Sequence, residues 1–183
     1  RGPRRDGICD ETGLLPQWPT NGPTLLWTST GLGQGYSAPI FVGDRFYITG
    51  DVQDRLEILA GDLNGKLLWR ATNGACWKNP YPGSRACCLY HRGRLYHRNA
   101  HGRLVCLDPV TGREQWAVDS LEKFDGKNIT WALSECLLGA EGRILVTAGG
   151  SRALLAALNA ETGQVIWQSE PLRLGDSPSE AHR

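Results

Sequence analysis

Residues 158–167 read LNAETGQVIW, and two earlier stretches share their pattern: residues 107–116 read LDPVTGREQW and residues 61–69 read GDLNGKLLW. In each stretch a glycine stands four residues before a tryptophan, and an Asp or Asn stands seven or eight residues before it. The repeated positions are Asp62, Gly65, Trp69, Asp108, Gly112, Trp116, Asn159, Gly163 and Trp167. A fourth tryptophan, Trp27, closes a similar Leu-Leu-Trp run. The four tryptophans lie 42, 47 and 51 residues apart, which indicates an internal repeat.

Each stretch has the local chemistry of a β-hairpin. An Asp or Asn side chain can bond to backbone groups of the turn that it begins, and glycine takes the positive φ that closes such a turn. Upstream of each hairpin lies a second pair of apolar runs with its own turn, near residues 38–49, 86–96 and 135–147. Each repeat is therefore predicted to contain about four short antiparallel strands. We expect little helix, because no segment sustains an apolar period of 3.6 residues.

Four strands in one repeat of this length is the size of a β-propeller blade. We therefore predict an all-β fold: an incomplete propeller of about three blades, each a four-stranded antiparallel sheet, plus one closing strand. The predicted regions are an N-terminal extension over 1–24, a partial propeller over 25–175 and a polar tail over 176–183. Within the propeller we expect the closing strand near 25–28 and the blades near 36–70, 84–117 and 132–168. A sandwich or barrel would explain the turns but not the repeated pattern that ends in tryptophan.

The composition limits the class of protein. The 183 residues carry 20 Lys+Arg against 19 Asp+Glu, with 40% hydrophobic and 21% charged residues. These values fit a folded globular protein, and they exclude a globally basic nucleic-acid binder and an acidic disordered tail. No apolar run approaches the roughly 18 residues that a membrane-spanning helix needs. Because the chain contains no Met, we expect it to be a processed or partial chain.

Residues 106–116 and 157–167 resemble the tryptophan-docking repeat of the PQQ-like (pyrroloquinoline-quinone repeat) β-propeller family. That family includes quinoprotein alcohol dehydrogenases and BamB-like proteins, the propeller lipoproteins of the outer-membrane barrel-assembly machinery. Residues 1–7 and 14–19, which precede the first Leu-Leu-Trp run, are similar to a bacterial subgroup that is often planctomycete. The resemblance implies an N-terminal partial chain of an exported, for instance periplasmic, propeller. It is specific for the fold and weak for activity, because family members include both oxidoreductases and non-catalytic scaffolds.

The quinoprotein members imply one functional alternative. The resemblance implies that such enzymes hold Ca²⁺ with Glu, Asn and Asp, use an Asp as base, and place PQQ between a Trp and a disulfide ring of adjacent cysteines. This chain has adjacent cysteines, Cys87 and Cys88, but we place them inside a predicted strand, where neighbouring side chains point to opposite faces. The chain shows no cluster with the spacing of Ca²⁺ ligands. No cofactor is therefore predicted for it, and PQQ and Ca²⁺ belong only to this alternative.

The cysteines do not form a recognisable framework. They are Cys9, Cys76, Cys87, Cys88, Cys106 and Cys136. An oxidising compartment permits disulfides, but these positions do not have the spacing of a small disulfide-dense scaffold. Mostly free and buried cysteines are the favoured interpretation. There is no Cys-x-x-Cys-His motif, so no attached c-type haem is predicted.

Residues 90–103 are locally basic and aromatic. One interpretation is a patch that binds an anion or nucleic acid, or a metal site built from His97, His101 and Cys106. The other is an ordinary antiparallel strand whose charged side chains point outward, with one shared face made by Arg94, Tyr96 and Arg98. The alternation favours the second interpretation, and the ligand spacing is loose for a metal. No metal site is predicted.

If the chain carries a binding site, its best candidate residues are Tyr36, Arg85, Trp77 and Trp131. Tyr36 and Arg85 stand just before the first strand pair of their blades, in the short runs GYSA and GSRA. In propellers the starts of the inner strands line the central channel. The alternative interpretation of all four residues is packing between blades. No catalytic residue is predicted.

Three functional hypotheses follow. The first is a non-catalytic scaffold or binding module that holds a protein or a small ligand through blade loops. The second is a fragment of a PQQ- and Ca²⁺-dependent quinoprotein alcohol dehydrogenase. The third is a protein that binds polysaccharide or polyanion through Arg92, Arg94 and Arg98. The expected partners are a protein, the remaining blades of the propeller, or a second copy that joins through open blade edges.

Overall fold

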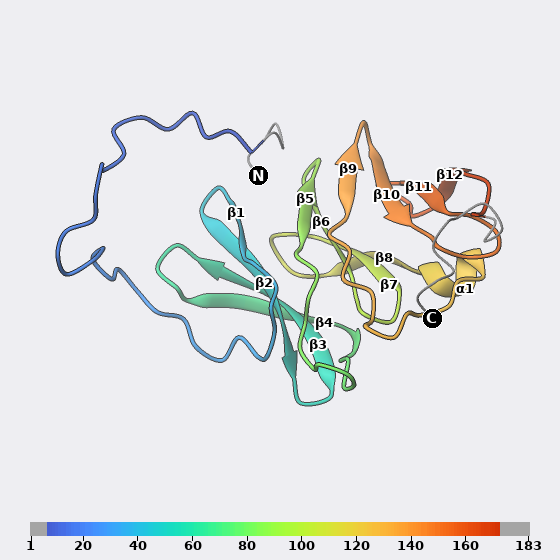
Figure 1. The fold of residues 1–183 in the computed structure, drawn as a ribbon, viewed down its shortest axis with the longest axis horizontal. Coiled ribbons are helices and arrows are strands. Elements are labelled where there is room, and N and C mark those ends of the chain that lie inside the picture. Colours follow the sequence, from blue (N-terminus) through green and yellow to red (C-terminus); the bar gives the residue numbers. More distant parts are fainter. Residues whose placement is uncertain (1–6, 173–183) are drawn as a thin grey trace, which may run out of the picture.

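The three predicted blades are present as separate sheets. A computed structural model describes residues 7–172, and within them twelve strands form three four-stranded antiparallel sheets. We call these sheets the first, second and third blade in chain order (Figure 1). The all-β, incomplete propeller is thereby confirmed, since the described sheets follow one another without closing into a ring.

Each blade runs through its four strands in chain order. The first contains β1 (Ile40–Val42), β2 (Arg45–Val52), β3 (Arg55–Asp62) and β4 (Leu67–Ala75). The second contains β5 (Leu89–His91), β6 (Arg94–Arg98), β7 (Arg103–Leu107) and β8 (Glu114–Asp119). The third contains β9 (Leu138–Ala140), β10 (Arg143–Thr147), β11 (Leu155–Asn159) and β12 (Val165–Gln168). The described residues contain one short helix, α1 (Ser120–Phe124), which lacks the length and apolar character needed to cross a bilayer.

The first half of each blade repeats with a strict period. The second strands β2, β6 and β10 begin at Arg45, Arg94 and Arg143, which are 49 residues apart. The turn before each of them contains a residue with positive φ at the same interval, Gly43, Arg92 or Glu141. Positions that differ by 49 residues are therefore structurally equivalent in neighbouring blades, up to the end of the second strand.

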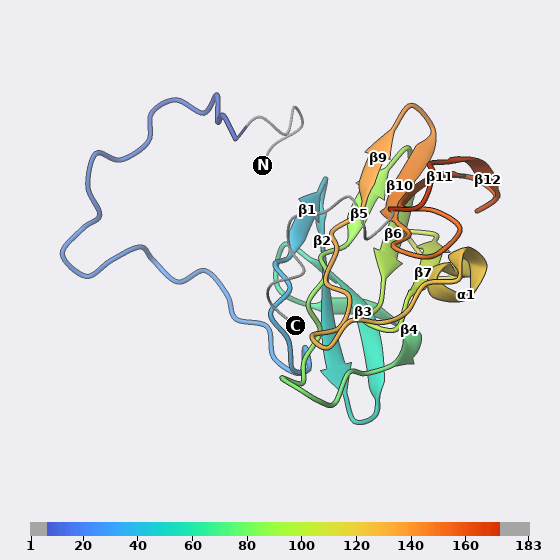
Figure 2. The same cartoon turned by 45° about the vertical axis from the view of Figure 1, so that its right-hand side comes forward.

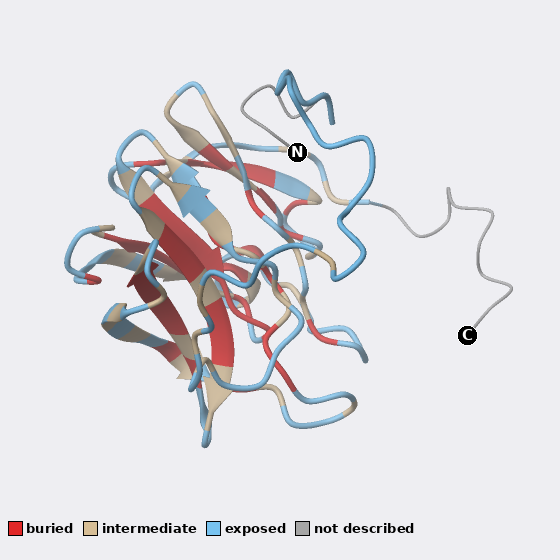
Figure 3. Cartoon of the chain, turned by 90° about the vertical axis from the view of Figure 1, so that its left-hand side faces the viewer, coloured by how far each residue is buried: buried red, intermediate tan, exposed pale blue. Residues whose placement is uncertain are grey.

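The apolar core lies between the blades. One buried cluster joins Tyr47 and Ile58 of the first blade to Leu95 of the second. A second cluster joins Tyr96 of the second blade to Ile144 of the third. Figure 3 shows buried residues along the central strands, while the hairpin tips and the N-terminal segment are exposed. Each blade thus covers its faces only by packing against its neighbours, as in other repeat proteins.

A tryptophan of one blade packs on a glycine of the next. The ring of Trp69 lies so close to Gly112 that a Cβ atom there would be 2.6 Å from its Cε3 atom, and its Nε1 donates to the carbonyl of Pro109 at 3.1 Å. The same contacts recur between the second and third blades, at Trp116, Gly163 and Ala160. The repeated glycine is required both by its positive φ and by this close approach.

The first strand of each blade begins later than the sequence predicts. β1, β5 and β9 begin at Ile40, Leu89 and Leu138, whereas the expected strands begin near residues 38, 86 and 135. Cys87 and Cys88 consequently lie in the segment before β5, which corrects their placement inside a strand. The reason is that residues just before these strands bond through side chains, as Ser37 does to Thr49 and Cys136 does to Cys87, and do not continue the backbone ladder.

The segment before the first blade forms no ladder. Figures 1 and 2 show it as a long loop outside the three sheets. Residues 25–28, where the closing strand is predicted, form no strand, because no described sheet edge supplies them with a hydrogen-bonded partner. Trp27 nevertheless stacks on Phe46 with ring centroids 5.7 Å apart. The predicted polar tail, residues 176–183, lies outside the described residues.

Candidate functional site

The segments that lead into β1, β5 and β9 meet at one end of the blades. We call residues 34–39, 83–88 and 132–137 the leading segments. Gly35 and Ser84 form a parallel bridge, and the backbone N–H of Tyr36 donates to the carbonyl of Ser84 at 2.6 Å. The backbone N–H of Cys87 donates to Sγ of Cys136 at 3.4 Å. The three leading segments therefore lie side by side, each bonded to the next.

The loop of residues 77–83 is held from within by two of the predicted site residues. The guanidinium of Arg85 donates to the carbonyls of Pro80, at 3.2 Å, and of Tyr81. Nε1 of Trp77 donates to the same Pro80 carbonyl at 2.9 Å. Arg85 and Trp77 thus act together, and their role in the structure is to shape this loop.

The other two predicted residues contact the same loop from its two sides. Tyr36 lies against Gly83: a Cβ atom added to Gly83 would be 3.1 Å from Cε2 of Tyr36. Trp131 stacks on Tyr81 with ring centroids 5.6 Å apart and an interplanar angle of 26°. Tyr36, Tyr81 and Trp131 are 69%, 64% and 58% exposed, respectively. We call these three side chains the aromatic surface.

Tyr81 is displayed by a strained backbone. Its φ is +56°, in the left-handed region that bulky residues rarely adopt. Such conformations persist where the surroundings impose them, and they concentrate at ligand-binding positions. The bonds from Arg85 and Trp77 to the loop supply that constraint. Sequence reasoning missed Tyr81, although the turn-rich run Asn79–Gly83 around it was a visible signal.

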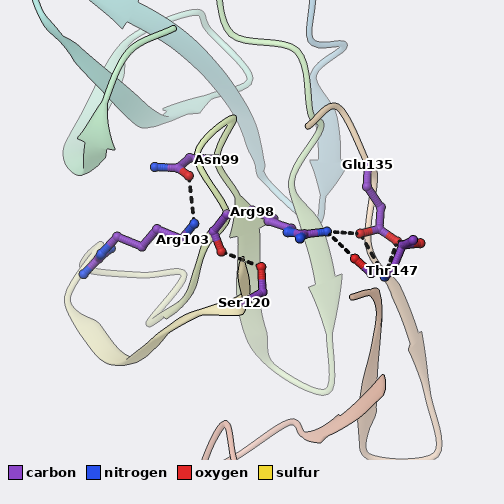
Figure 4. Close-up of polar contacts among 7 residues, drawn as sticks. Arg98, Asn99, Arg103, Ser120, Glu135 and Thr147 are labelled. Carbon is purple, nitrogen blue, oxygen red and sulfur yellow. Dashed lines mark hydrogen bonds and ion pairs between the residues drawn. The ribbon is translucent and has the colours of Figure 1, made fainter. Parts of the chain in front are cut away.

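A polar cluster lies beneath the leading segments of the second and third blades. The Arg98 side chain is 1% exposed, and its Nη1 donates to Oε2 of Glu135 and to the carbonyl of Thr147, both at 2.8 Å (Figure 4). Glu135 also accepts from the N–H and the hydroxyl of Thr147, at 2.9 and 2.7 Å. Burial lowers the pKa of Arg98, while the carboxylate of Glu135 opposes that change. Arg98 thereby ties the second blade to the third.

This burial corrects the prediction for residues 90–103. Tyr96 and Arg98 do share one face of β6, but both are buried, because the third blade covers that face. Sequence alternation alone does not show that a second sheet lies there. The exposed Arg92 and the half-buried Arg94 line a groove of about 530 Å³ whose wall also contains Glu141. A groove with charges of both signs does not form the continuous basic patch that polyanion binding requires.

Two of the three histidines in the basic stretch, His97 and His101, have separate environments. His97 is fully buried, its Nδ1 lies 3.0 Å from Nδ2 of Asn73, and burial lowers its pKa to about 4. His101 lies against the ring of Trp77 at 5.4 Å between centroids. Throughout residues 7–172, no three His, Cys, Asp or Glu side chains are grouped so that they could hold a metal ion.

The adjacent cysteines do not form a platform for a planar cofactor. Cys88 is buried among Tyr47 and Leu95, and burial raises the pKa of its thiol. Cys87 is half-buried and faces Cys136 of the next leading segment. All six cysteines are free thiols, and Cys9 and Cys136 are exposed rather than buried. Because the two thiols lie in different environments, they do not form the ring of adjacent cysteines that the resemblance implies for a PQQ site.

Comparisons with known proteins extend these findings. The protein-family model described as "Outer membrane protein assembly factor BamB" matches residues 55–182. The dehydrogenase subunit of the quinone-dependent alcohol dehydrogenase of Gluconacetobacter polyoxogenes is 32% identical over 120 residues, which cover 57% of this chain and 15% of the relative. BamB of Nitrosomonas eutropha is 36% identical over 81 residues, which cover 44% of this chain and 17% of the relative.

A solved structure shares the fold. The quinohemoprotein alcohol dehydrogenase of Comamonas testosteroni superposes with a TM-score of 0.59 at 21% identity, over 79% of this chain and 22% of that protein. The chain therefore spans 15% and 17% of the length of the two curated relatives above and a comparable part of this structure. Since the family model covers more than half of a chain that folds into three such blades, the chain belongs to the PQQ-like β-propeller family that includes BamB.

Proposed function

We propose that the chain is a non-catalytic binding module of a PQQ-like propeller and that it holds a protein or a small ligand at its leading segments. The observation that carries this proposal is the aromatic surface, in which the exposed Tyr81 of an internally bonded loop is joined by two exposed rings, Tyr36 and Trp131, that contact the loop. Aromatic side chains offer a large contact area, and little conformational entropy is lost when they are already fixed. Exposed aromatic residues that cluster on a constrained loop are typical of binding sites.

The groups next to the aromatic surface support binding rather than chemistry. The guanidinium of Arg85 is engaged with loop carbonyls. Asp51 is the acidic group behind the loop; burial raises its pKa, while the nearby N–H of Gly83 lowers it. The hydrogen bonds that Trp77 and Arg85 donate within this loop go to backbone carbonyls, which are not reacting groups. The quinoprotein alternative has support from relatives but not from the donor groups found here.

Binding can be tested by comparing matched exposed aromatic residues. Labelled protein is applied to arrays of peptides and of oligosaccharides, and dissociation constants are then measured for the ligands found. We expect the Tyr81→Ser/Trp131→Ser variant to bind at least about tenfold more weakly, because aromatic residues dominate such contacts. Trp18→Ser is the control, since Trp18 is equally exposed but lies in the N-terminal segment. Equal affinities for both variants would reject the aromatic surface.

A separate assay addresses the enzyme alternative. The protein is mixed with PQQ and Ca²⁺, tryptophan fluorescence is followed, and dye-linked oxidation of primary alcohols is measured. We expect neither saturable quenching nor turnover, because the adjacent cysteines and the acidic residues present no site for the pair. Turnover that requires both additions would overturn the non-catalytic assignment.

We also propose that the face of the third blade that no described residue covers packs against a further blade of the propeller. Trp27, Trp69 and Trp116 each lie on the repeat glycine of the blade that follows them. Trp167 is the next tryptophan of the series, is 43% exposed, and lines a groove of about 250 Å³ with Leu138. If Trp167 makes the same contacts as the earlier tryptophans, this face is covered by a blade that places a repeat glycine against its ring and a backbone carbonyl near its Nε1.

Oxidative footprinting of the protein isolated from its source organism tests this packing. We expect Trp167 to be as protected as Trp116, and Trp18 to react freely. Reactivity of Trp167 equal to that of Trp18 would contradict the proposal. Footprinting at several protein concentrations then distinguishes blades of the same protein from a second copy, because only a second copy makes the protection of Trp167 depend on concentration. Sedimentation analysis checks whether a dimer forms over the same concentrations.

We propose that the protein is exported, in keeping with the outer-membrane role that the family description names.

A further inference from the structure

Three equivalent positions of the leading segments bring two cysteines together. Ala38, Cys87 and Cys136 are 49 residues apart, the same interval that separates the starts of β2, β6 and β10. Residues related by this interval occupy neighbouring places around the propeller axis. The sequence period therefore places the two thiols next to each other on adjoining blades.

The contacts confirm this arrangement atom by atom. The backbone N–H of Cys87 donates to Sγ of Cys136 at 3.4 Å, and the nearby Cys136 thiol adds to burial in raising the pKa of the Cys87 thiol. On the other side, Cys87 approaches the backbone of Ala38. β5 and β9, which follow the two cysteines, lie against each other. The adjoining Cys88 is fully buried in the core between the first and second blades and is not the exposed partner.

We propose that Cys87 and Cys136 form a redox-active pair, which oxidises to a disulfide that joins the leading segments of the second and third blades. Cys136 is exposed and Cys87 is half-buried, so a small oxidant reaches Cys136 first. The co-reactant is a low-molecular-weight disulfide such as glutathione disulfide. This inference does not depend on the proposed binding function.

The reaction is an ordinary thiol–disulfide exchange. The thiolate of Cys136 attacks one sulfur of glutathione disulfide, forms a mixed disulfide and releases one glutathione thiolate. The thiolate of Cys87 then attacks Sγ of Cys136, closes the protein disulfide and releases the second glutathione. The two protein thiols lose two electrons and two protons in total, and one glutathione disulfide becomes two glutathione thiols. Burial raises the pKa of Cys87, so the second step accelerates as the pH rises.

The bond would fix two parts of the aromatic surface relative to each other. Arg85, which shapes the loop of Tyr81, lies two residues before Cys87. Trp131 lies five residues before Cys136. A covalent link between the two leading segments therefore limits how far Trp131 can move from Tyr81. Reduction releases that limit without removing either ring.

Peptide mapping tests the pair directly. The protein carries Cys9→Ser to prevent cross-links between molecules, and it is oxidised with glutathione disulfide at mildly alkaline pH. We expect the peptides of Cys87 and Cys136 to be joined, with the loss of two hydrogen atoms and no retained glutathione. Cys88→Ala should leave this product unchanged, and Cys87→Ser should leave glutathione on Cys136. A Cys87–Cys88 product, or glutathione that stays on Cys136 in the wild type, would overturn the proposal.

Thermal unfolding gives a second readout that does not depend on the peptide map. A disulfide between Cys87 and Cys136, which are 49 residues apart, is expected to raise the unfolding midpoint by about 5–10 °C when the oxidised and reduced proteins are compared. Cys136→Ser should show no difference between the two conditions. An oxidised wild-type protein whose midpoint does not rise would contradict a link between blades.

Discussion

Trp116 and Trp167 close the same sequence pattern but have different surroundings. Trp116 packs on Gly163, donates to the carbonyl of Ala160 at 3.1 Å, and adds to the core between the second and third blades. Trp167 is 43% exposed beside an open groove. The pattern therefore specifies a hairpin in both places, while the contribution of the tryptophan depends on the blade that follows it. This is the behaviour of a repeat protein, in which stability is a sum of units and of interfaces between neighbours.

The largest expected effect is the loss of a covered tryptophan. Trp116→Ala should lower the free energy of unfolding by about 3 kcal/mol, because it leaves a cavity between two blades and removes one of the two hydrogen bonds that the carbonyl of Ala160 accepts. Trp167→Ala in the same chain should change it by less than about 0.5 kcal/mol, as for other exposed residues. Urea unfolding followed by circular dichroism measures both values. Equal losses would mean that Trp167 is covered in solution.

The glycine beneath the tryptophan should matter next. Gly163→Ala places a Cβ atom 2.7 Å from Cε3 of Trp116, at a φ of +71°. We expect a loss of about 2–3 kcal/mol from the combined steric and backbone strain. Gly93→Ala is the matched control, since its φ is +76° and nothing lies within 4 Å of the added atom. The control should lose only about 1 kcal/mol, which is the backbone cost alone.

Acid should weaken the interface between the first and second blades. His97 is buried against Asn73, and burial lowers its pKa from 6.5 to about 4. Between pH 6.5 and pH 4, the His97 imidazole is therefore protonated in the unfolded chain but neutral in the folded chain. The free energy of unfolding is consequently highest above about pH 6.5 and decreases progressively toward pH 4. We expect the free energy of unfolding to fall by about 2 kcal/mol between pH 7 and pH 5.

Urea midpoints measured across this pH range test the effect. In His97→Gln the same decrease should disappear, because glutamine does not titrate. A variant that keeps the full decrease would assign the acid sensitivity to another group. The second interface contains the Arg98–Glu135 pair instead of a neutral histidine, so Trp116→Ala should leave the slope unchanged.

The smallest effect separates a single hydrogen bond from ring packing. The hydroxyl of Tyr96 donates to the carbonyl of Ala160 at 2.9 Å. The same carbonyl also accepts from Nε1 of Trp116. Tyr96→Phe should therefore cost about 1 kcal/mol, the usual net value of one buried hydrogen bond. Tyr90→Phe, on an exposed side chain, should stay within about 0.3 kcal/mol of the wild type. Equal unfolding midpoints for the two variants would show that the Tyr96 hydroxyl adds nothing to the interface.

The blades could be predicted because their information is local. In each repeat an Asx side chain begins a turn, and its oxygen accepts backbone N–H groups, as Asp108 does from Val110 and Thr111 at 2.9 and 2.8 Å. Such bonds form within a few residues and are visible in the sequence. The first strands were predicted two or three residues too early, because leading-segment residues such as Ser37 and Cys136 bond through their side chains and do not continue the backbone ladder.

The candidate site could be predicted only in part. Position in the repeat singled out Tyr36 and Arg85. The structure brings both to the loop of residues 77–83, which contains Trp77 and stacks against Trp131. Neither the exposure of Tyr81 nor the burial of Arg98 followed from alternation. A strand pattern shows which side chains share a face, but it does not show which face the next blade covers.

The sequence by itself determined the hairpins and the blade repeat, because turn chemistry and apolar alternation act over a few neighbouring residues. The tertiary structure decided which copy of each motif is covered. It buries Arg98 against Glu135, seats Trp116 on Gly163 and places Cys87 beside Cys136. These contacts join residues 37 to 49 positions apart, and burial and pairing at that separation depend on how whole sheets pack against one another.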